Sequence, residues 1–240
     1  MRGDGVPVVD ISADPAKVGA ELDEICRTTG FFQVTGHGID DGVAEPAWTV
    51  ATRFLDLPLE DKLAVARPTP DYPYGYIPLA GESLSQSMAA TAEPPDLKEV
   101  FNMGPPGRPG RAFADPGEAW SYSPNRWPDA LPGLRPAWAA YYDAMRGLGN
   151  RLMSLFAWGL GLPPGFFAGK TGHGPNALRA VNYPGQEHAP RPGMPYFQNA
   201  NWSARISCLP SCLAPGEKPR YEPVLAGPHL MGKFRRSVGA

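Results

Sequence analysis

Glycine and proline interrupt this sequence so often that they limit the length of any helix or strand it can form. The chain has 28 glycines and 30 prolines among 240 residues, which is about twice the usual share of these two residues. They follow no fixed period, so a collagen-like fold is excluded. They cluster in residues 68–136 and 161–228, where they separate short apolar runs. This pattern is typical of loop-rich sheet architecture and also of poorly ordered segments, and it leaves both interpretations open.

Size and charge exclude several classes of protein. At 25.8 kDa the chain can form one large domain or two small ones and bury a core without disulfides. Its 22 basic and 24 acidic residues are spread along the sequence, so no basic stripe for a nucleic acid is predicted. No apolar run approaches the roughly 20 residues of a membrane span, and the first residues lack the apolar core of a signal peptide. We therefore expect a cytoplasmic protein without a nucleic-acid or membrane partner, and its three cysteines argue against a disulfide framework.

Helical periodicity is clearest in the first two thirds of the chain. Asp14 and Pro15 form a helix start, and apolar residues at helical spacing predict a helix that ends at Gly30. A second helix is expected over residues 41–55, followed by a short one that starts at Pro58. The strongest pattern spans residues 138–155, where apolar side chains recur every three or four positions. This spacing predicts a core helix.

Strands are predicted only in short runs. Residues 31–34 form one such run, and residues 97–103 form the only one expected between Pro68 and Pro136. After Gly161, strand-like runs lie at residues 178–183, 204–208 and 221–225. So few strands cannot close a jelly-roll barrel. We expect the helix at residues 138–155 to pack against a small open sheet.

Several segments resemble one family and occur in its order. They lie at residues 6–11, 30–39, 54–58, 98–104 and 125–128, and residues 30–39, Gly-Phe-Phe-Gln-Val-Thr-Gly-His-Gly-Ile, are the most specific. They resemble the isopenicillin N synthase-like family of non-haem iron oxygenases, most of which use 2-oxoglutarate. The resemblance implies an α+β fold, with an N-terminal helical portion and an incomplete remnant of a double-stranded β-helix, or jelly roll.

The same resemblance divides the chain into three parts. Residues 1–136 correspond to the N-terminal region of non-haem dioxygenases. Residues 137–176 correspond to the long core helix and its connection. Residues 177–240 correspond to a truncated remnant of the oxygenase barrel.

The family's iron ligands have no counterpart in this sequence. The resemblance implies a His-x-Asp pair and a second histidine, a set that suits Fe(II), followed by Arg-x-Ser for the co-substrate carboxylate. No His-x-Asp occurs in the chain, and its last aspartate is Asp143. Gly193 runs directly into Met194 and a segment that resembles family sequence from beyond Arg-x-Ser. We infer an internal deletion near Gly193 and Met194 that removes all three iron ligands.

The remaining polar residues offer few substitutes. Tyr183 matches a family tyrosine that helps to hold 2-oxoglutarate, which is otherwise anchored by chelation to the metal. Glu187 and His188 are the best metal candidates by composition, although the resemblance places them in a loop ahead of the ligands. The other candidates are expected to be structural or incidental. They are His37, His173, His229, the Arg-x-Ser sequence at Arg205 to Ser207, Cys208 and Cys212.

The resemblance implies a parent enzyme that oxidises a small molecule with Fe(II) and 2-oxoglutarate. We expect this chain to bind neither cofactor and to be inactive as an oxygenase. The alternatives are a non-enzymatic binding or interaction module and a deletion product without function. Loss of barrel strands is expected to expose the apolar stripe of residues 138–155 and the strand at residues 178–183, which favours self-association or a protein partner. The substrate cannot be deduced, because the family's substrate contacts come largely from the missing segment.

Overall fold

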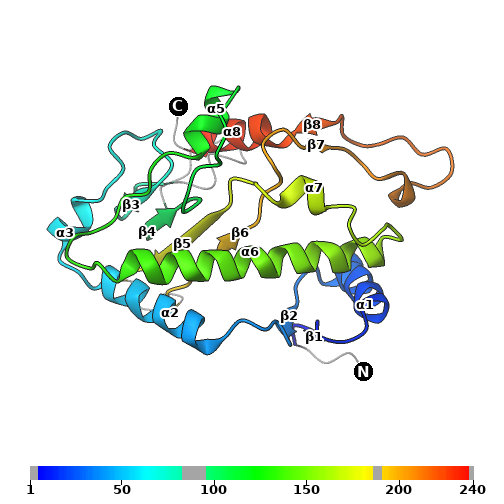
Figure 1. Cartoon of the computed structure of the whole chain (residues 1–240), viewed down its shortest axis with the longest axis horizontal. Coiled ribbons are helices and arrows are strands. Elements are labelled where there is room, and N and C mark those ends of the chain that lie inside the picture. Colours follow the sequence, from blue (N-terminus) through cyan, green and yellow to red (C-terminus); the bar gives the residue numbers. More distant parts are fainter. Residues whose placement is uncertain (1–4, 83–95, 186–190, 238–240) are drawn as a thin grey trace.

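The structure is a computed structural model that describes residues 5–82, 96–185 and 191–237. The chain contains both helices and strands, with several runs of one kind, in agreement with the α+β expectation (Figure 1). The helices are α1 (Pro15–Thr28), α2 (Asp41–Leu55), α3 (Leu59–Leu63), α5 (Pro116–Ser121), α6 (Leu134–Gly159), α7 (Ala168–Thr171), the 3-10 helix η1 (Pro210–Cys212) and α8 (Ala226–Ser237). The strands are β1 (Val8–Asp10), β2 (Gln33–Thr35), β3 (Gly75–Ile77), β4 (Glu99–Met103), β5 (Ala177–Asn182), β6 (Tyr196–Phe197), β7 (Arg205–Ile206) and β8 (Val224–Leu225).

Capping residues in the sequence set the ends of α1. The Asp14 side chain accepts a hydrogen bond from the backbone N–H of Lys17 at 3.1 Å, and Pro15 occupies the first turn, where no N–H is needed. After the helix, Gly30 has a φ of 73°, a conformation that favours glycine. Its N–H donates to the carbonyl of Ile25 at 2.8 Å. The predicted start and end of this helix are therefore confirmed.

The long helix α6 runs along the molecule and carries the predicted apolar stripe (Figure 1). One hydrophobic cluster joins α2, strands β3 to β5 and the first half of α6, with Trp138 and Tyr142 buried at its centre. A second cluster joins β1, α1 and the last part of α6 around Leu155. Because both clusters include the same helix, α6 connects the two halves of the core.

Strands β3, β4, β5 and β6 form a four-stranded antiparallel sheet in that order. Side chains alternate between its two faces, so Phe101 and Leu178 point toward α6 while Asn102 and Arg179 point to the other side. The pairs β1–β2 and β7–β8 form separate two-stranded sheets. Among the described residues no strand closes the four-stranded sheet into a barrel, so the expectation of a small open sheet is confirmed.

The predicted strands differ from the observed ones in several regions, and β1 and β6 have no predicted counterpart. The structure contains β3 within residues 68–136, where the sequence predicts a strand only at residues 97–103; its three residues lie between Pro73 and Pro78. Strands β7 and β8 have two residues each, shorter than the predicted runs at 204–208 and 221–225. Short segments between prolines give little periodicity, and their pairing depends on partners distant in the sequence.

Helices α5, α7 and α8 and the 3-10 helix η1 have no counterpart in the sequence analysis. Helix α8 begins with Ala-Gly-Pro, residues that usually interrupt a helix, but Pro228 lies in the first turn, where proline is tolerated. Helix α8 packs on α5, and the rings of Phe234 and Trp120 lie 4.7 Å apart. Tertiary packing therefore stabilises both short helices.

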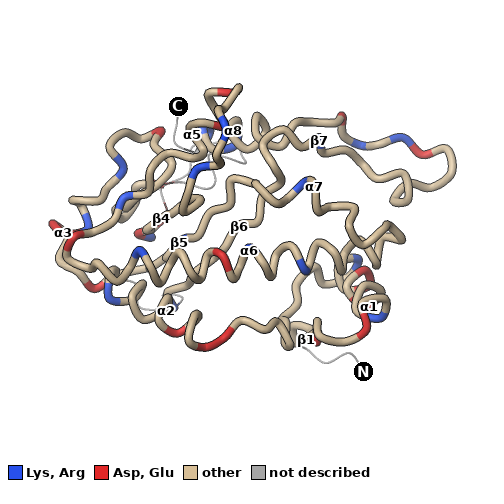
Figure 2. Tube along the Cα trace, in the orientation of Figure 1, with Lys and Arg blue, Asp and Glu red and all other residues tan. Residues whose placement is uncertain are grey.

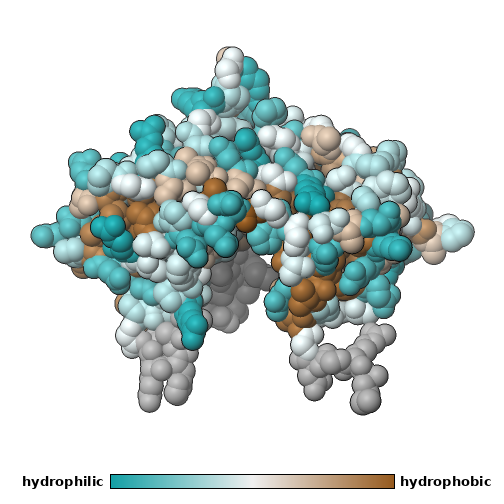
Figure 3. Space-filling model, turned by 60° about the horizontal axis from the view of Figure 1, so that its bottom comes forward, coloured by the Kyte–Doolittle hydropathy of each residue, from teal (hydrophilic) through white to brown (hydrophobic). Residues whose placement is uncertain are grey.

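The predicted exposure of the long helix and of residues 178–183 is wrong. Leu178 and Trp138 are 0 % exposed and Ala180 is 1 % exposed, because α1, α2, the sheet and α6 cover one another. Exposed apolar side chains lie elsewhere, including Val8 at 57 % and Phe31 at 74 %. Figure 3 shows hydrophobic surface on the side of the molecule that carries α1, β1 and β2.

Charged residues of both signs are interspersed along the trace (Figure 2). Among the described residues, no helix combines the length and the apolar character needed to cross a bilayer.

A buried ion pair fixes α3 against the sheet. Lys62 Nζ lies 2.9 Å from Glu99 Oε2, the Tyr76 hydroxyl donates to the same oxygen at 2.6 Å, and Asn182 Nδ2 donates to Oε1 at 2.8 Å. Burial alone would raise the pKa of Glu99, but the hydrogen bonds from these three side chains outweigh it and hold the pKa below its ordinary value. The side chains of Lys62 and Glu99 are only 10 % and 5 % exposed. Removing either charge therefore leaves the other one buried and unpaired.

We expect Lys62→Met to lower the free energy of unfolding by about 3 kcal/mol at neutral pH, because the Glu99 carboxylate loses its counter-charge. Since the folded pKa of Glu99 lies below its ordinary value of 4.5, the carboxylate contributes stability above that pH and loses it as the pH falls through the folded pKa. The difference between wild type and variant should therefore shrink below pH 4.5. Denaturant unfolding measured from neutral to acid pH tests this, with the exposed Lys17→Met as the control. Equal effects of the two substitutions would contradict the prediction.

Candidate functional site

The residues predicted from the sequence do not converge on one site. Tyr183 directly follows β5 and is half-buried. Its neighbour Asn182 donates to Glu99 on the helix-covered side of the sheet. Glu187 and His188 lie outside the described residues, so no surroundings can be assigned to them.

The other histidines have separate surroundings. His37 Nδ1 accepts a hydrogen bond from the backbone N–H of Ile39 at 3.0 Å, within the turn after β2. His173 is exposed in the loop before β5, and its backbone N–H donates to Asn201 Oδ1 at 2.6 Å. His229 is exposed on α8. Each of the three lies in a different part of the fold.

The Arg-x-Ser sequence and the cysteine pair lie together on the segment that includes β7 and η1. Arg205 and Ser207 are exposed. Cys208 and Cys212 are exposed free thiols. None of these side chains lines the cavity described below.

The described side chains do not fit a bound iron ion. An Fe(II) oxygenase site needs two imidazoles and a carboxylate that converge on one point. Within residues 5–82, 96–185 and 191–237, no three His, Cys, Asp or Glu side chains lie close enough together to hold a metal ion. We therefore assign no chemical step to iron on these residues.

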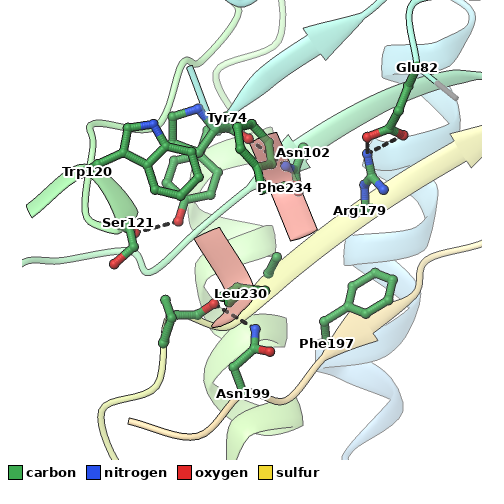
Figure 4. A pocket seen from close by; sticks show the side chains of 13 residues that line it. Tyr74, Glu82, Asn102, Trp120, Ser121, Arg179, Phe197, Asn199, Leu230 and Phe234 are labelled. Atoms are coloured by element: carbon green, nitrogen blue, oxygen red, sulfur yellow. Dashed lines mark hydrogen bonds and ion pairs between the residues drawn. The ribbon is translucent and has the colours of Figure 1, made fainter. Parts of the chain in front are cut away.

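A cavity of about 210 Å³ lies on the face of the sheet opposite α6 (Figure 4). Asn102 on β4 and Arg179 on β5 line it from the sheet. Aromatic side chains line it from three further elements, with Trp120 on α5, Phe197 on β6 and Phe234 on α8. Segments that lie far apart between residues 73 and 234 thus meet at this cavity.

The charges beside the cavity are paired. Arg179 Nη2 lies 2.9 and 2.8 Å from the two carboxylate oxygens of Glu82. Lys98 Nζ lies 3.6 Å from Glu82 and 2.8 Å from Asp96. The side chains of Glu82, Lys98 and Arg179 are at most 15 % exposed. Arg67 also interacts with Glu82 and Arg179, and each of the two cations Arg179 and Lys98 is engaged with an anion.

Neutral hydrogen bonds hold the cavity walls. The buried Tyr74 hydroxyl donates to the carbonyl of Ser121 at 2.5 Å, and burial raises the pKa of Tyr74, which keeps it protonated. Asn199 Nδ2 donates to the carbonyl of Pro175 at 2.8 Å (Figure 4). Burial likewise raises the pKa of Tyr196, to about 12. The Tyr74 bond connects the chain before β3 to α5. The Asn199 bond connects the loop before β5 to the chain after β6.

The sequence analysis does not identify this cavity, although the alternation of residues in two strands marks two of its lining side chains. Asn102 and Arg179 alternate with buried apolar residues in β4 and β5, and a polar residue at such a position marks the second face of a strand. Trp120 and Phe234 lie on helices that the sequence did not predict, so only the folded chain brings them to the site.

Comparison with known proteins identifies relatives of the chain. Residues 6–130 match a family model described as non-haem dioxygenase in morphine synthesis N-terminal. Validamycin A dioxygenase from Streptomyces hygroscopicus subsp. limoneus is 33% identical over 177 residues, which cover 70% of this chain and 47% of that protein. The 2-oxoglutarate-Fe(II) type oxidoreductase hxnY from Emericella nidulans is 30% identical over 190 residues, which cover 75% and 53%. This chain spans about half the length of these curated relatives.

Solved structures share the fold. A full-length Neurospora crassa protein in complex with alpha-KG matches with a TM-score of 0.78 at 20% identity, over 98% of this chain and 97% of that chain. A 2OG-Fe(II) oxygenase family protein from Caulobacter crescentus matches with a TM-score of 0.80 at 20% identity, over 97% of this chain and 99% of that chain. These structures belong to the jelly-roll fold of 2-oxoglutarate oxygenases, of which this chain shows a partial sheet.

Gly104 permits the tight packing behind Tyr74 at the edge of the cavity. A Cβ atom at this position would collide with the Tyr74 ring, whereas one at Gly107 would meet nothing within 4 Å. We expect Gly104→Ala to lower the free energy of unfolding by about 1–3 kcal/mol through overpacking. Gly107→Ala is the matched control and should change it by less than about 0.5 kcal/mol. Thermal or denaturant unfolding of both variants tests this, and equal stabilities would show that Tyr74 moves aside freely.

Proposed function

Because the chain belongs to the non-haem dioxygenase family, whose relatives include 2-oxoglutarate- and Fe(II)-dependent oxidoreductases, we propose that it binds a small molecule without oxidising it. One contrast carries the proposal. The described residues form a lined cavity on the open face of the sheet, but they bring no three metal-ligating side chains together. A binding function needs the first feature alone, whereas the family's oxidation needs an iron ligand set.

We attribute the missing ligands to an internal deletion near Gly193 and Met194. Two hydrogen bonds support this: Val181 N–H donates to the Gly193 carbonyl at 2.9 Å, and Gly193 N–H donates to the Val181 carbonyl at 3.0 Å. The chain after Gly193 therefore returns along β5 and continues into β6. Because these two hydrogen bonds pair the proposed junction with β5, the chain can fold without the missing segment. The division into residues 1–136, 137–176 and 177–240 is part of the same proposal.

We also propose that neither Fe(II) nor 2-oxoglutarate is bound. Tyr183 is the one described residue that the family resemblance assigns to 2-oxoglutarate, and its hydroxyl is a single donor. A dicarboxylate that is not chelated to a metal needs several charged partners to offset the free-energy cost of its desolvation.

Purified chain incubated anaerobically with Fe(II) and then desalted should retain no stoichiometric iron, because three converging ligands are missing. It should also form no succinate from 2-oxoglutarate. Metal analysis and a succinate assay test this, with the Emericella nidulans oxidoreductase hxnY treated in parallel as the positive control. One iron per chain together with succinate formation would overturn the proposal. Glu187→Gln and His188→Ala would then show whether these residues supply ligands.

A second candidate function, association with another copy of the chain, is favoured by the β7–β8 pair. Ile206 lies opposite Val224, and the two are 46 % and 40 % exposed. Leu225 and Tyr221 beside them are 50 % and 72 % exposed. A two-stranded sheet is only marginally stable by itself. Pairing with a second copy would cover these side chains and extend the sheet.

We expect the chain to self-associate at micromolar concentration and Val224→Asp to shift it toward monomer. The added charge would have to be buried in the contact, which is unfavourable. Val8→Asp is the matched control, because Val8 is also exposed but lies on β1. Sedimentation velocity of the three proteins tests this. A monomeric wild type, or an equal effect of both substitutions, would exclude β7–β8 as the contact.

A further inference from the structure

Two buried polar atoms beside the cavity lack partners. They are Asn102 Oδ1 and Arg179 Nε, and neither has a hydrogen-bond partner among the described residues. Leaving such an atom unsatisfied is unfavourable, and buried polar groups in native proteins are nearly always paired. Both atoms belong to residues that line the cavity. A bound molecule is therefore one way in which the fold can satisfy them.

The two atoms offer one acceptor and one donor. The Asn102 amide nitrogen donates to the carbonyl of Pro73 at 2.6 Å, which leaves Oδ1 as its free acceptor. Arg179 Nη2 is engaged with Glu82, which leaves the Nε–H as a free donor. Asn102 and Arg179 face each other across β4 and β5, so their side chains leave the same face of the sheet as neighbours.

We propose that this cavity binds a neutral, flat ligand whose edge carries an N–H beside a C=O, as in a primary carboxamide or a lactam. The ligand N–H donates to Asn102 Oδ1, and its carbonyl accepts from Arg179 Nε. The inference rests on the proposed function in that the ligand is bound and released unchanged.

Charge selects against the acidic and basic alternatives. Arg179 and Lys98 are already engaged with Glu82 and Asp96, so neither of these two cations is a free counter-charge for a carboxylate. A carboxylate also has no N–H for Asn102. A protonated amine has no acceptor for Arg179. A ligand edge with both groups satisfies both atoms.

The remaining lining selects a flat apolar body. Trp120 and Phe234 contact each other, and Phe197 lines another side (Figure 4). Aromatic rings prefer offset or edge contacts with another ring, which supports an aromatic carboxamide or lactam. A cavity of about 210 Å³ suits a compound of one or two rings.

Benzamide and 2-quinolinone are suitable probes, measured by isothermal titration calorimetry on the full chain. N,N-dimethylbenzamide lacks the N–H, and benzoate replaces the amide by a charged group. We expect both probes to bind, and both controls to bind at least tenfold more weakly than benzamide, the loss that one hydrogen bond represents. No binding of either probe, or equal binding of benzamide and N,N-dimethylbenzamide, would overturn the inference.

Variants locate the site. Arg179→Lys keeps a cation for Glu82 but removes the Nε–H, and it should weaken benzamide binding about tenfold. Asn102→Leu removes the acceptor and should abolish the preference for benzamide over N,N-dimethylbenzamide. Arg126→Lys is the matched control, because Arg126 Nε is also buried without a partner in the described structure but does not line the cavity. An equal loss in Arg126→Lys would overturn the assignment.

Two further measurements keep the test decisive if a variant folds poorly. In the unaltered protein, benzamide should shift the Arg179 Nε–H resonance in the NMR spectrum, and the absence of a shift at saturation would overturn the inference. Oxidation of benzamide in the presence of Fe(II) and 2-oxoglutarate would overturn the proposed function but leave the binding assignment intact. Failure of the proposed function is thus distinguishable from failure of the binding assignment.

Discussion

The packing of α6 is the constraint on which the rest of the structure depends. Its 26 residues correspond to a length of about 39 Å, and both hydrophobic clusters share it. At one end the backbone of α1 approaches closely through Gly19 and Gly159, where a Cβ atom on either glycine would meet the other helix. At the other end Trp138 Nε1 donates to the carbonyl of Ala47 on α2 at 3.2 Å. Helices α1 and α2 and the sheet therefore bury one continuous stripe.

Because α6 and α2 cover one face of the four-stranded sheet, the candidate binding cavity lies on the other face. In a closed jelly roll that face would be enclosed by further strands. Here α5, α8 and the chain around β6 surround it and leave a cavity. The same arrangement explains why the long helix is not an exposed surface, because its partner helices α1 and α2 lie in the N-terminal half of the chain.

The two buried ion pairs of the sheet differ in a way that separates structure from binding. On the helix-covered face, Glu99 receives hydrogen bonds from Lys62, Tyr76 and Asn182, and none of its side-chain atoms is left unsatisfied among the described residues. On the open face, Arg179 is paired with Glu82 but keeps one unsatisfied N–H beside the cavity. A fully satisfied network stabilises the fold, whereas a partly satisfied one beside a cavity has capacity for a ligand.

The sequence by itself determined the helices α1, α2, α3 and α6 and the family. The cap at Asp14, the glycine at residue 30 and the stripe of residues 138–155 act locally, within a few turns of one helix, so periodicity was enough to predict them. Local pattern also marked β4 and β5. Tertiary structure alone decided the rest. Strands β3 and β6 have three and two residues and exist because a partner strand lies beside them, and α8 forms on α5 despite its Ala-Gly-Pro start. The cavity belongs to this second group, because its walls come from residues 73 to 234 and no local signal records which of them will meet.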